Sequence, residues 1–269
     1  MSALTLAALT PDGIEIEYRE ARDLSEIAVL PDWDVACITT LSAQAFEAYS
    51  IADRFRARGT TVIMGGLHVT SVPDEALEHA DAVVVGEGEP AWPRVLEDLR
   101  AQRLQRVYRS AGSFDLAHAP IPRFELLDPA RYNRIPIQTS RGCPHRCEFC
   151  ASSILLTPKY RTKPVARVLA EIRRVKEIWD RPFLELADDN SFAVRSHGKE
   201  LLAALARENV RWFTEADISI ADDEALLDGL ADGGCRQVLV GLESPASASL
   251  GGIELRRDWK RERLEGYER

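Results

Sequence analysis

Residues 135–150 read IPIQTSRGCPHRCEFC, a predicted strand followed at once by three closely spaced cysteines. The run 135–139 is mostly apolar, as expected for a buried strand. Cys143, Cys147 and Cys150 then follow in the pattern C-x3-C-x2-C. Thiolates are soft ligands that select iron–sulfur clusters, zinc or copper(I). We therefore take this loop as the candidate metal site of the chain.

Three thiols on one loop favour an iron–sulfur cluster. They can hold three corners of a 4Fe–4S cube, whereas most such clusters take a fourth cysteine. The remaining iron then keeps an open position that a small molecule with an amine and a carboxylate can chelate. Structural zinc is the alternative, since His145 lies inside the loop. Zinc sites usually take four ligands as two pairs, however, and the sequence holds no second pair of cysteines.

Strands and helices alternate after this loop. We expect strands at 183–186, 210–214 and 237–242, and helices at 164–179, 196–208, 222–231 and 255–267. Together with the strand before the cysteines, these segments make four βα units, which are typical of a TIM-like barrel. Four units cannot close a barrel. We therefore predict a partial βα barrel over residues 135–269 that is incomplete at its C-terminal end.

The first part of the chain shows the same alternation. Predicted strands at 35–39, 61–64 and 82–85 alternate with helices, and 14–18 has the period of a further strand. This order predicts an α/β fold with a Rossmann-like parallel sheet and helices on both faces. We place that domain at residues 1–110 and expect it to be incomplete at its N-terminal end. Prolines and the lack of a clear period make 111–134 a predicted linker.

Composition limits the possible partners. The 269 residues carry a formal net charge of −9, which disfavours nonspecific attraction to nucleic acid. No apolar run is long enough for a membrane span, and we expect none. Three of the five cysteines are clustered, which indicates a metal site in a reducing compartment rather than a disulfide framework. We therefore expect a cytoplasmic protein.

The cysteine motif resembles that of the radical S-adenosylmethionine (SAM) superfamily. In that family the pattern C-x3-C-x2-C follows a strand and has an aromatic residue before its last cysteine, a place that Phe149 fills. The resemblance covers roughly residues 135–255. It implies a 4Fe–4S cluster held by Cys143, Cys147 and Cys150, with the remaining iron binding the amine and carboxylate of SAM. It also implies reductive cleavage of SAM to methionine and a 5′-deoxyadenosyl radical.

The same resemblance implies SAM contacts after the three later strands. A carboxylate there would form charge-assisted hydrogen bonds to the SAM ammonium group or bonds to its ribose. Only one of two adjacent aspartates is expected to point inward. A helix-capping turn and a solvated loop end are the alternatives after the first two strands. The candidate residues are Asp188, Asp189, Glu215, Asp217, Glu243 and Ser244.

The first domain resembles the cobalamin-binding domain that precedes one subgroup of radical SAM enzymes. The resemblance rests on three strand-end loops, and the implied contacts are Thr39, Leu41, Gly65, Gly66, Gly86 and Gly88. The D-x-H-x-x-G element that supplies an axial histidine is absent, and His68 is not in its place. Axial ligation therefore stays open. A purely structural Rossmann-like domain is the alternative, whereas a nicotinamide site would need G-x-G-x-x-G.

We therefore expect a cobalamin-dependent radical SAM enzyme that transfers a methyl group to a carbon centre of a small-molecule substrate. An electron donor such as flavodoxin or ferredoxin would supply the reducing electron. A cyclase, oxidase or rearrangement enzyme with the same cofactors is the second possibility. The third is a noncatalytic iron–sulfur-binding fragment, because both domains look truncated.

Overall fold

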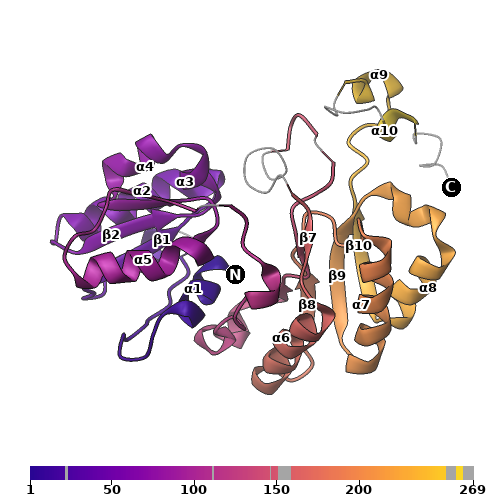
Figure 1. The fold of residues 1–269 in the computed structure, drawn as a ribbon, viewed down its shortest axis with the longest axis horizontal. Helices are drawn as coiled ribbons and strands as arrows, with labels where there is room; N and C mark the ends of the chain where they lie inside the picture. Colours follow the sequence, from indigo (N-terminus) through magenta and orange to yellow (C-terminus); the bar gives the residue numbers. More distant parts are fainter. Residues whose placement is uncertain (22–23, 111, 146, 151–158, 253–258, 263–269) are drawn as a thin grey trace. The chain divides into compact units, whose positions relative to one another are not determined.

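A computed structural model describes residues 1–21, 24–110, 112–145, 147–150, 159–252 and 259–262. The chain divides into two compact units, Met1–Phe114 and Asp115–Arg269 (Figure 1). Each unit is built on its own parallel sheet. In the described ranges, no helix is both long and apolar enough to cross a membrane.

The first unit contains a four-stranded parallel sheet with neighbours in the order β1-β2-β3-β4. Its central strands are almost entirely apolar, as expected where helices cover both faces of a parallel sheet. One face packs against α2, α3 and α4, and the other against α1 and α5. The strands are β1 (Val35–Thr39), β2 (Thr61–Gly65), β3 (Ala82–Val85) and β4 (Val107–Arg109), and the helices are α1 (Ser2–Leu9), α2 (Ala45–Arg56), α3 (Leu67–Ser71), α4 (Pro73–His79) and α5 (Gly88–Arg100), with short 3-10 turns η1 (Leu24–Ile27) and η2 (Ser42–Gln44).

The predicted strand at 14–18 is wrong. These residues alternate in exposure but do not join the sheet. The fourth position is taken by β4, which is only three residues long and therefore too short to show a period in the sequence. An alternating pattern reports a half-buried segment, but only a hydrogen-bonded neighbour makes it a strand.

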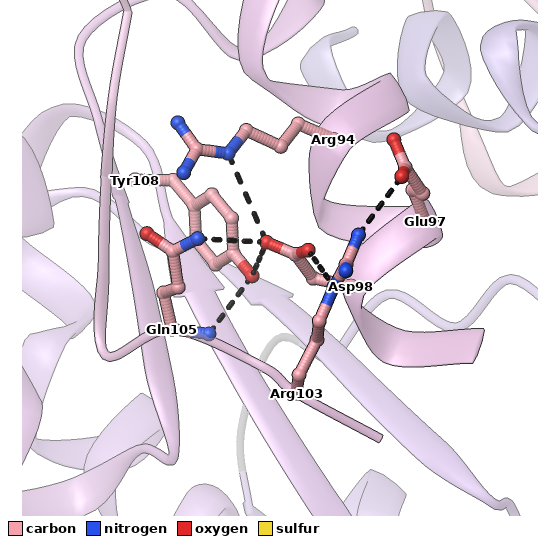
Figure 2. A network of polar contacts seen from close by, with 6 residues as sticks. All are labelled: Arg94, Glu97, Asp98, Arg103, Gln105 and Tyr108. Atoms are coloured by element: carbon pink, nitrogen blue, oxygen red, sulfur yellow. Dashed lines mark hydrogen bonds and ion pairs between the residues drawn. The ribbon is translucent and has the colours of Figure 1, made fainter. Parts of the chain in front are cut away.

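A polar network fixes the C-terminal end of α5 to the segment that leads into β4 (Figure 2). The Asp98 carboxylate accepts hydrogen bonds from Arg103 Nε at 2.9 Å, Gln105 Nε2 at 3.0 Å and the Tyr108 hydroxyl at 3.1 Å. Asp98 is buried, so these donors compensate for the loss of its hydration. The network lies at the C-terminal end of α5. The strand-end loop predicted to bind a ligand lies at the other end of α5, where β3 leads into the helix.

The second unit contains a parallel sheet in the order β10-β9-β8-β5, and α6, α7 and α8 connect its strands. In β8 the side chains of Leu184 and Leu186 are buried, while Glu185 between them is partly accessible. In β9 Trp212 is buried and Glu215 is exposed. The predicted run of βα units is therefore confirmed; that these units form a partial barrel stays a prediction. The elements are β5 (Ile135–Ile137), α6 (Val165–Ile178), β8 (Phe183–Leu186), α7 (Arg195–Glu208), β9 (Arg211–Ala216), η7 (Ile218–Asp222), α8 (Glu224–Asp232), β10 (Cys235–Val240), α9 (Ser247–Leu250) and α10 (Trp259–Glu262).

The stretch that we expected to be a linker is mostly part of the second unit. Its residues from 115 onward form the 3-10 turns η3 (Leu116–His118), η4 (Phe124–Leu126) and η5 (Pro129–Arg131). Arg167 of α6 donates a hydrogen bond to the Ala119 carbonyl at 2.6 Å. The prolines in this stretch interrupt the hydrophobic period of the sequence, but the stretch still packs against the rest of the second unit. Of the helix expected at 255–267, only residues 259–262 lie within the described ranges.

Candidate functional site

The cysteine loop leaves the carboxyl end of β5 through a short antiparallel hairpin, β6 (Ser140–Arg141) with β7 (Arg161–Thr162). Gly142 begins the loop with a φ of 84°, a conformation that favours glycine. Its N–H donates a hydrogen bond to Asp189 Oδ2 at 3.0 Å. The loop is thereby attached to the segment that follows β8.

The three thiols of the loop differ in burial. Cys147 is buried, and Cys143 and Cys150 are partly buried. The Cys150 N–H donates to the Cys147 carbonyl at 3.0 Å. Burial, together with the Asp189 and Cys150 charges, raises the pKa of the Cys143 thiol to about 11, although hydrogen bonds from the His145 N–H and the Asn190 side chain act in the opposite direction. Within the described ranges, no three side chains of His, Cys, Asp and Glu form a metal-binding group.

The donor set nonetheless suits an iron–sulfur cluster. Burial without a metal disfavours a thiolate, whereas a bound cation removes that penalty and stabilises deprotonated sulfur. All three donors are thiols from one loop, and the alternative zinc ligand His145 is directed elsewhere, toward Asp217. The chemistry of the donors therefore fits iron and sulfide better than a four-ligand zinc site.

Asp188 lies within the protein core. Its carboxylate accepts hydrogen bonds from Thr139 N at 2.8 Å, from Ser140 N at 2.9 Å and from Ser191 Oγ at 3.0 Å, and it also accepts one from the Thr139 hydroxyl. Burial raises its pKa, and these hydrogen bonds oppose that effect. Asp188 therefore connects the start of the cysteine loop to the end of β8.

Asp189 and Glu215 are exposed at the same carboxyl edge of the sheet. Burial raises the pKa of Glu215, and the nearby Glu185 and Asp189 charges raise it further, against the effect of Arg134. Arg134 is itself paired with Glu185 at 3.1 Å and stacked over the Phe213 ring at 4.8 Å. The edge therefore has an excess of negative charge that suits an ammonium group.

Asp217 follows β9 and turns toward the cysteine loop. Its Oδ2 accepts a hydrogen bond from Asn190 Nδ2 at 2.7 Å and lies 3.3 Å from His145 Nε2, while Oδ1 accepts from Ser219 N at 2.7 Å. Although burial raises it, these hydrogen bonds together hold the pKa of Asp217 well below its ordinary value. The interactions join the ends of β8 and β9 to the loop.

Glu243 and Ser244 follow β10. Glu243 has a φ of 63°, which is unfavourable for a residue other than glycine, and its carboxylate pairs with Lys260 of α10. The Lys260 ammonium nitrogen also lies 5.9 Å from the centre of the Phe149 ring in the cysteine loop. The Ser244 hydroxyl accepts a hydrogen bond from Ala246 N at 3.1 Å.

Sequence reasoning missed several polar residues that organise this edge. Thr139 and Ser191 bind Asp188, and the side chain of Asn190 hydrogen-bonds the Cys143 thiol. Lys163 and Glu171 form a buried ion pair at 2.7 Å close by. The run from Asp188 to Ser191 is entirely polar and begins two residues after the end of the predicted strand. This unbroken polar run was the signal in the sequence that could have identified Asn190 and Ser191.

The strand-end loops of the first unit are joined to one another. His68 N donates to the Thr40 carbonyl at 3.4 Å, and Gly86 N donates to Thr70 Oγ1 at 3.0 Å. These loops contain all the residues predicted to contact cobalamin. Among them Thr39 and Leu41 are exposed, whereas Gly65, Gly66, Gly86 and Gly88 are partly buried.

The glycines in these loops have different structural roles. Gly66 has a φ of 99°, and a Cβ there would lie 2.6 Å from Thr39 Oγ1; Gly86 has a φ of 89° and would meet Ser110 Oγ at 2.5 Å. The chain's own packing therefore requires both glycines. At Gly65, in contrast, a Cβ would make only ordinary contacts at 3.7 Å. Gly65 thus leaves space at the sheet edge, beside exposed Thr39, that a flat ligand could use.

The chain is similar to several known proteins. Residues 137–269 match the model of the radical SAM superfamily. Bacteriochlorophyllide d C-8(2)-methyltransferase of Chlorobaculum tepidum is 31% identical over 93% of this chain and 58% of its own length. Hopanoid C-2 methylase of Rhodopseudomonas palustris is 26% identical over 92% of this chain and 49% of its own. The chain spans about half the length of the curated relatives it matches.

Solved structures show the same fold. The radical S-adenosylmethionine methyltransferase TsrM from Kitasatospora setae, with tryptophan and a SAM analogue bound, superposes with a TM-score of 0.73. That match has 20% sequence identity and covers 98% of this chain and 61% of TsrM. A second TsrM structure, with cobalamin and a 4Fe–4S cluster bound, gives a TM-score of 0.64 at 18% identity, over 81% of this chain and 50% of TsrM.

Proposed function

Because residues 137–269 belong to the radical SAM superfamily, as the cysteine motif predicted, we propose that this chain acts in a cobalamin-dependent radical SAM methyl transfer to a carbon centre. The observation that carries the proposal is the thiol loop attached to the carboxylate edge by Gly142 and Asp189. Methyltransferase names among the relatives support the reaction class. The substrate is a small molecule.

Each group of residues has a part in this proposal. Cys143, Cys147 and Cys150 hold the cluster, which supplies the electron that cleaves SAM when both are bound. Asp189 and Glu215 present negative charge to the SAM ammonium group. In this proposal Glu243, which pairs with Lys260, accepts hydrogen bonds from the ribose hydroxyls. Asp188 positions the loop and does not contact SAM.

The direct test is SAM cleavage. The reconstituted chain, given dithionite under anaerobic conditions, should form 5′-deoxyadenosine in proportion to its cluster content. A chain that holds the cluster but forms none is the noncatalytic fragment. A chain that cleaves SAM and retains cobalamin, yet yields an unmethylated product once its substrate is known, has the cyclase, oxidase or rearrangement activity instead.

Removing the negative charge of Glu215 should weaken SAM binding. A lost hydrogen bond that involves a charged group costs about 1–3 kcal/mol, so the Kd of Glu215→Gln should rise by about 5- to 150-fold. Equilibrium dialysis with the reconstituted protein measures this. Asp232→Asn, at the exposed C-terminal end of α8, is the matched control and should bind as the unaltered chain does. Unchanged binding in both Glu215→Gln and Glu243→Gln would remove the assignment.

Filling the space at Gly65 should weaken cobalamin binding. Overpacking costs about 1–3 kcal/mol, so Gly65→Leu should weaken the binding of hydroxocobalamin by about 5- to 150-fold. Retention after desalting is read from the visible absorption. Gly65→Ala is the control, because its Cβ meets only ordinary contacts. If the unaltered chain cleaves SAM but retains no cobalamin, the first unit is a structural domain and the methyl-transfer proposal fails.

A further inference from the structure

Two hydrogen-bond donors lie beside the Cys143 thiol and lower its pKa, against the effect of burial. One is the backbone N–H of His145, two residues later in the loop, and the other is the side chain of Asn190, in the segment that follows β8. Hydrogen bonds to ligand sulfurs are among the factors that set the reduction potential of an iron–sulfur cluster. The position of these two donors therefore bears on any cluster that the loop holds.

A single carboxylate holds both donor residues. Asp217 Oδ2 accepts the hydrogen bond from Asn190 Nδ2 at 2.7 Å and lies 3.3 Å from the ring nitrogen Nε2 of His145. The side chain of Asp217 is only 13% exposed, so solvent competes weakly for these interactions. Asn190 is 3% exposed, and within the described ranges its Oδ1 has no hydrogen-bond partner. Asp217 is thus the charged partner that orients the amide.

We propose that Asp217 is a positioning residue for the cluster, which fixes His145 and Asn190 so that both donate to the Cys143 sulfur. This inference rests on the proposed function, because it requires a cluster on the loop. It also gives Asp217 a role other than the SAM contact suggested by its place after the strand. Its two oxygens are already engaged by His145, Asn190 and the N–H of Ser219.

The test uses Asp217→Ser in the anaerobically reconstituted 269-residue chain. Serine is a good N-cap residue and can still accept the Ser219 N–H, but it cannot reach His145 and Asn190 together. Loss of an outer-shell partner typically costs 10- to 100-fold in metal affinity, so iron should pass to a chelator about tenfold faster or more. The EPR spectrum of the reduced cluster should change as well. Asn190→Ala should reproduce both effects.

Asp223→Ser is the matched control. Asp223 caps α8 through Leu226 N at 3.1 Å and bonds to Lys199, away from the loop. Its substitution should leave iron release and the EPR spectrum unchanged. If the unaltered chain takes up no cluster, the proposed function fails. If it does, and Asp217→Ser and Asn190→Ala release iron at the control rate with an unchanged spectrum, only this inference fails. Weaker SAM binding with an unchanged cluster would also overturn it.

Discussion

Cys147→Ala should lower bound iron from about four atoms per chain, the content of one 4Fe–4S cube, to background. Cys147 is buried in the middle of the loop, and the remaining two loop thiols cannot hold a cube alone. Within the second unit, Cys235 cannot replace it, because it begins β10, at the end of the sheet opposite the loop. Iron and sulfide analysis with the visible absorption of the cluster measures the loss.

Cys235→Ala is the control for the cluster experiment. It removes one thiol from the same unit but not from the loop, so iron, sulfide and absorption should equal those of the unaltered chain. Stoichiometric zinc without sulfide in anaerobically purified protein would contradict the cluster assignment. In that case His145 would have to turn from Asp217 to become the fourth ligand.

Asp188→Ala should destabilise the second unit by about 3 kcal/mol or more. The substitution leaves the buried donors on Thr139, Ser140 and Ser191 without their acceptor, and each unsatisfied buried group costs about 1–3 kcal/mol. A small cavity adds to the loss. Urea unfolding followed by circular dichroism measures the change in midpoint without the need for any cofactor.

Asp189→Asn is the matched control for Asp188. The two residues are adjacent, but Asp189 is exposed and an asparagine oxygen can still accept from Gly142 N. Its effect on the free energy of unfolding should stay within about 0.5 kcal/mol, as for most surface substitutions. Equal destabilisation by the two substitutions would show that Asp188 is not the residue that connects the loop to the sheet.

Local pattern was sufficient for most of the fold. Apolar runs of strand length separated by amphipathic segments located β1, β2, β3, β5, β8, β9 and β10 and the helices between them. The hydrophobic pattern failed to predict strands correctly where the strand was very short or where an alternating segment had no neighbouring strand. The segment β4 has three residues, and 14–18 alternates without a neighbouring strand. Proline-rich residues 115–134 pack against the second unit through contacts such as Arg167 to Ala119, which no local pattern encodes.

The sequence by itself was sufficient to predict the position and type of a metal site, because the three thiols lie within one short loop and their spacing is a local property. Because parallel strands have their carboxyl ends at one edge of the sheet, the sequence also predicted that the carboxylates after these strands lie near that loop. Only the tertiary structure decided which hydrogen-bond partners each carboxylate has. Asp188 meets Thr139 across 49 positions and Asp217 meets His145 across 72. Such pairings depend on how the chain packs. The adjacent residues Asp188 and Asp189 have the same chemistry and differ only in the direction in which the backbone points their side chains.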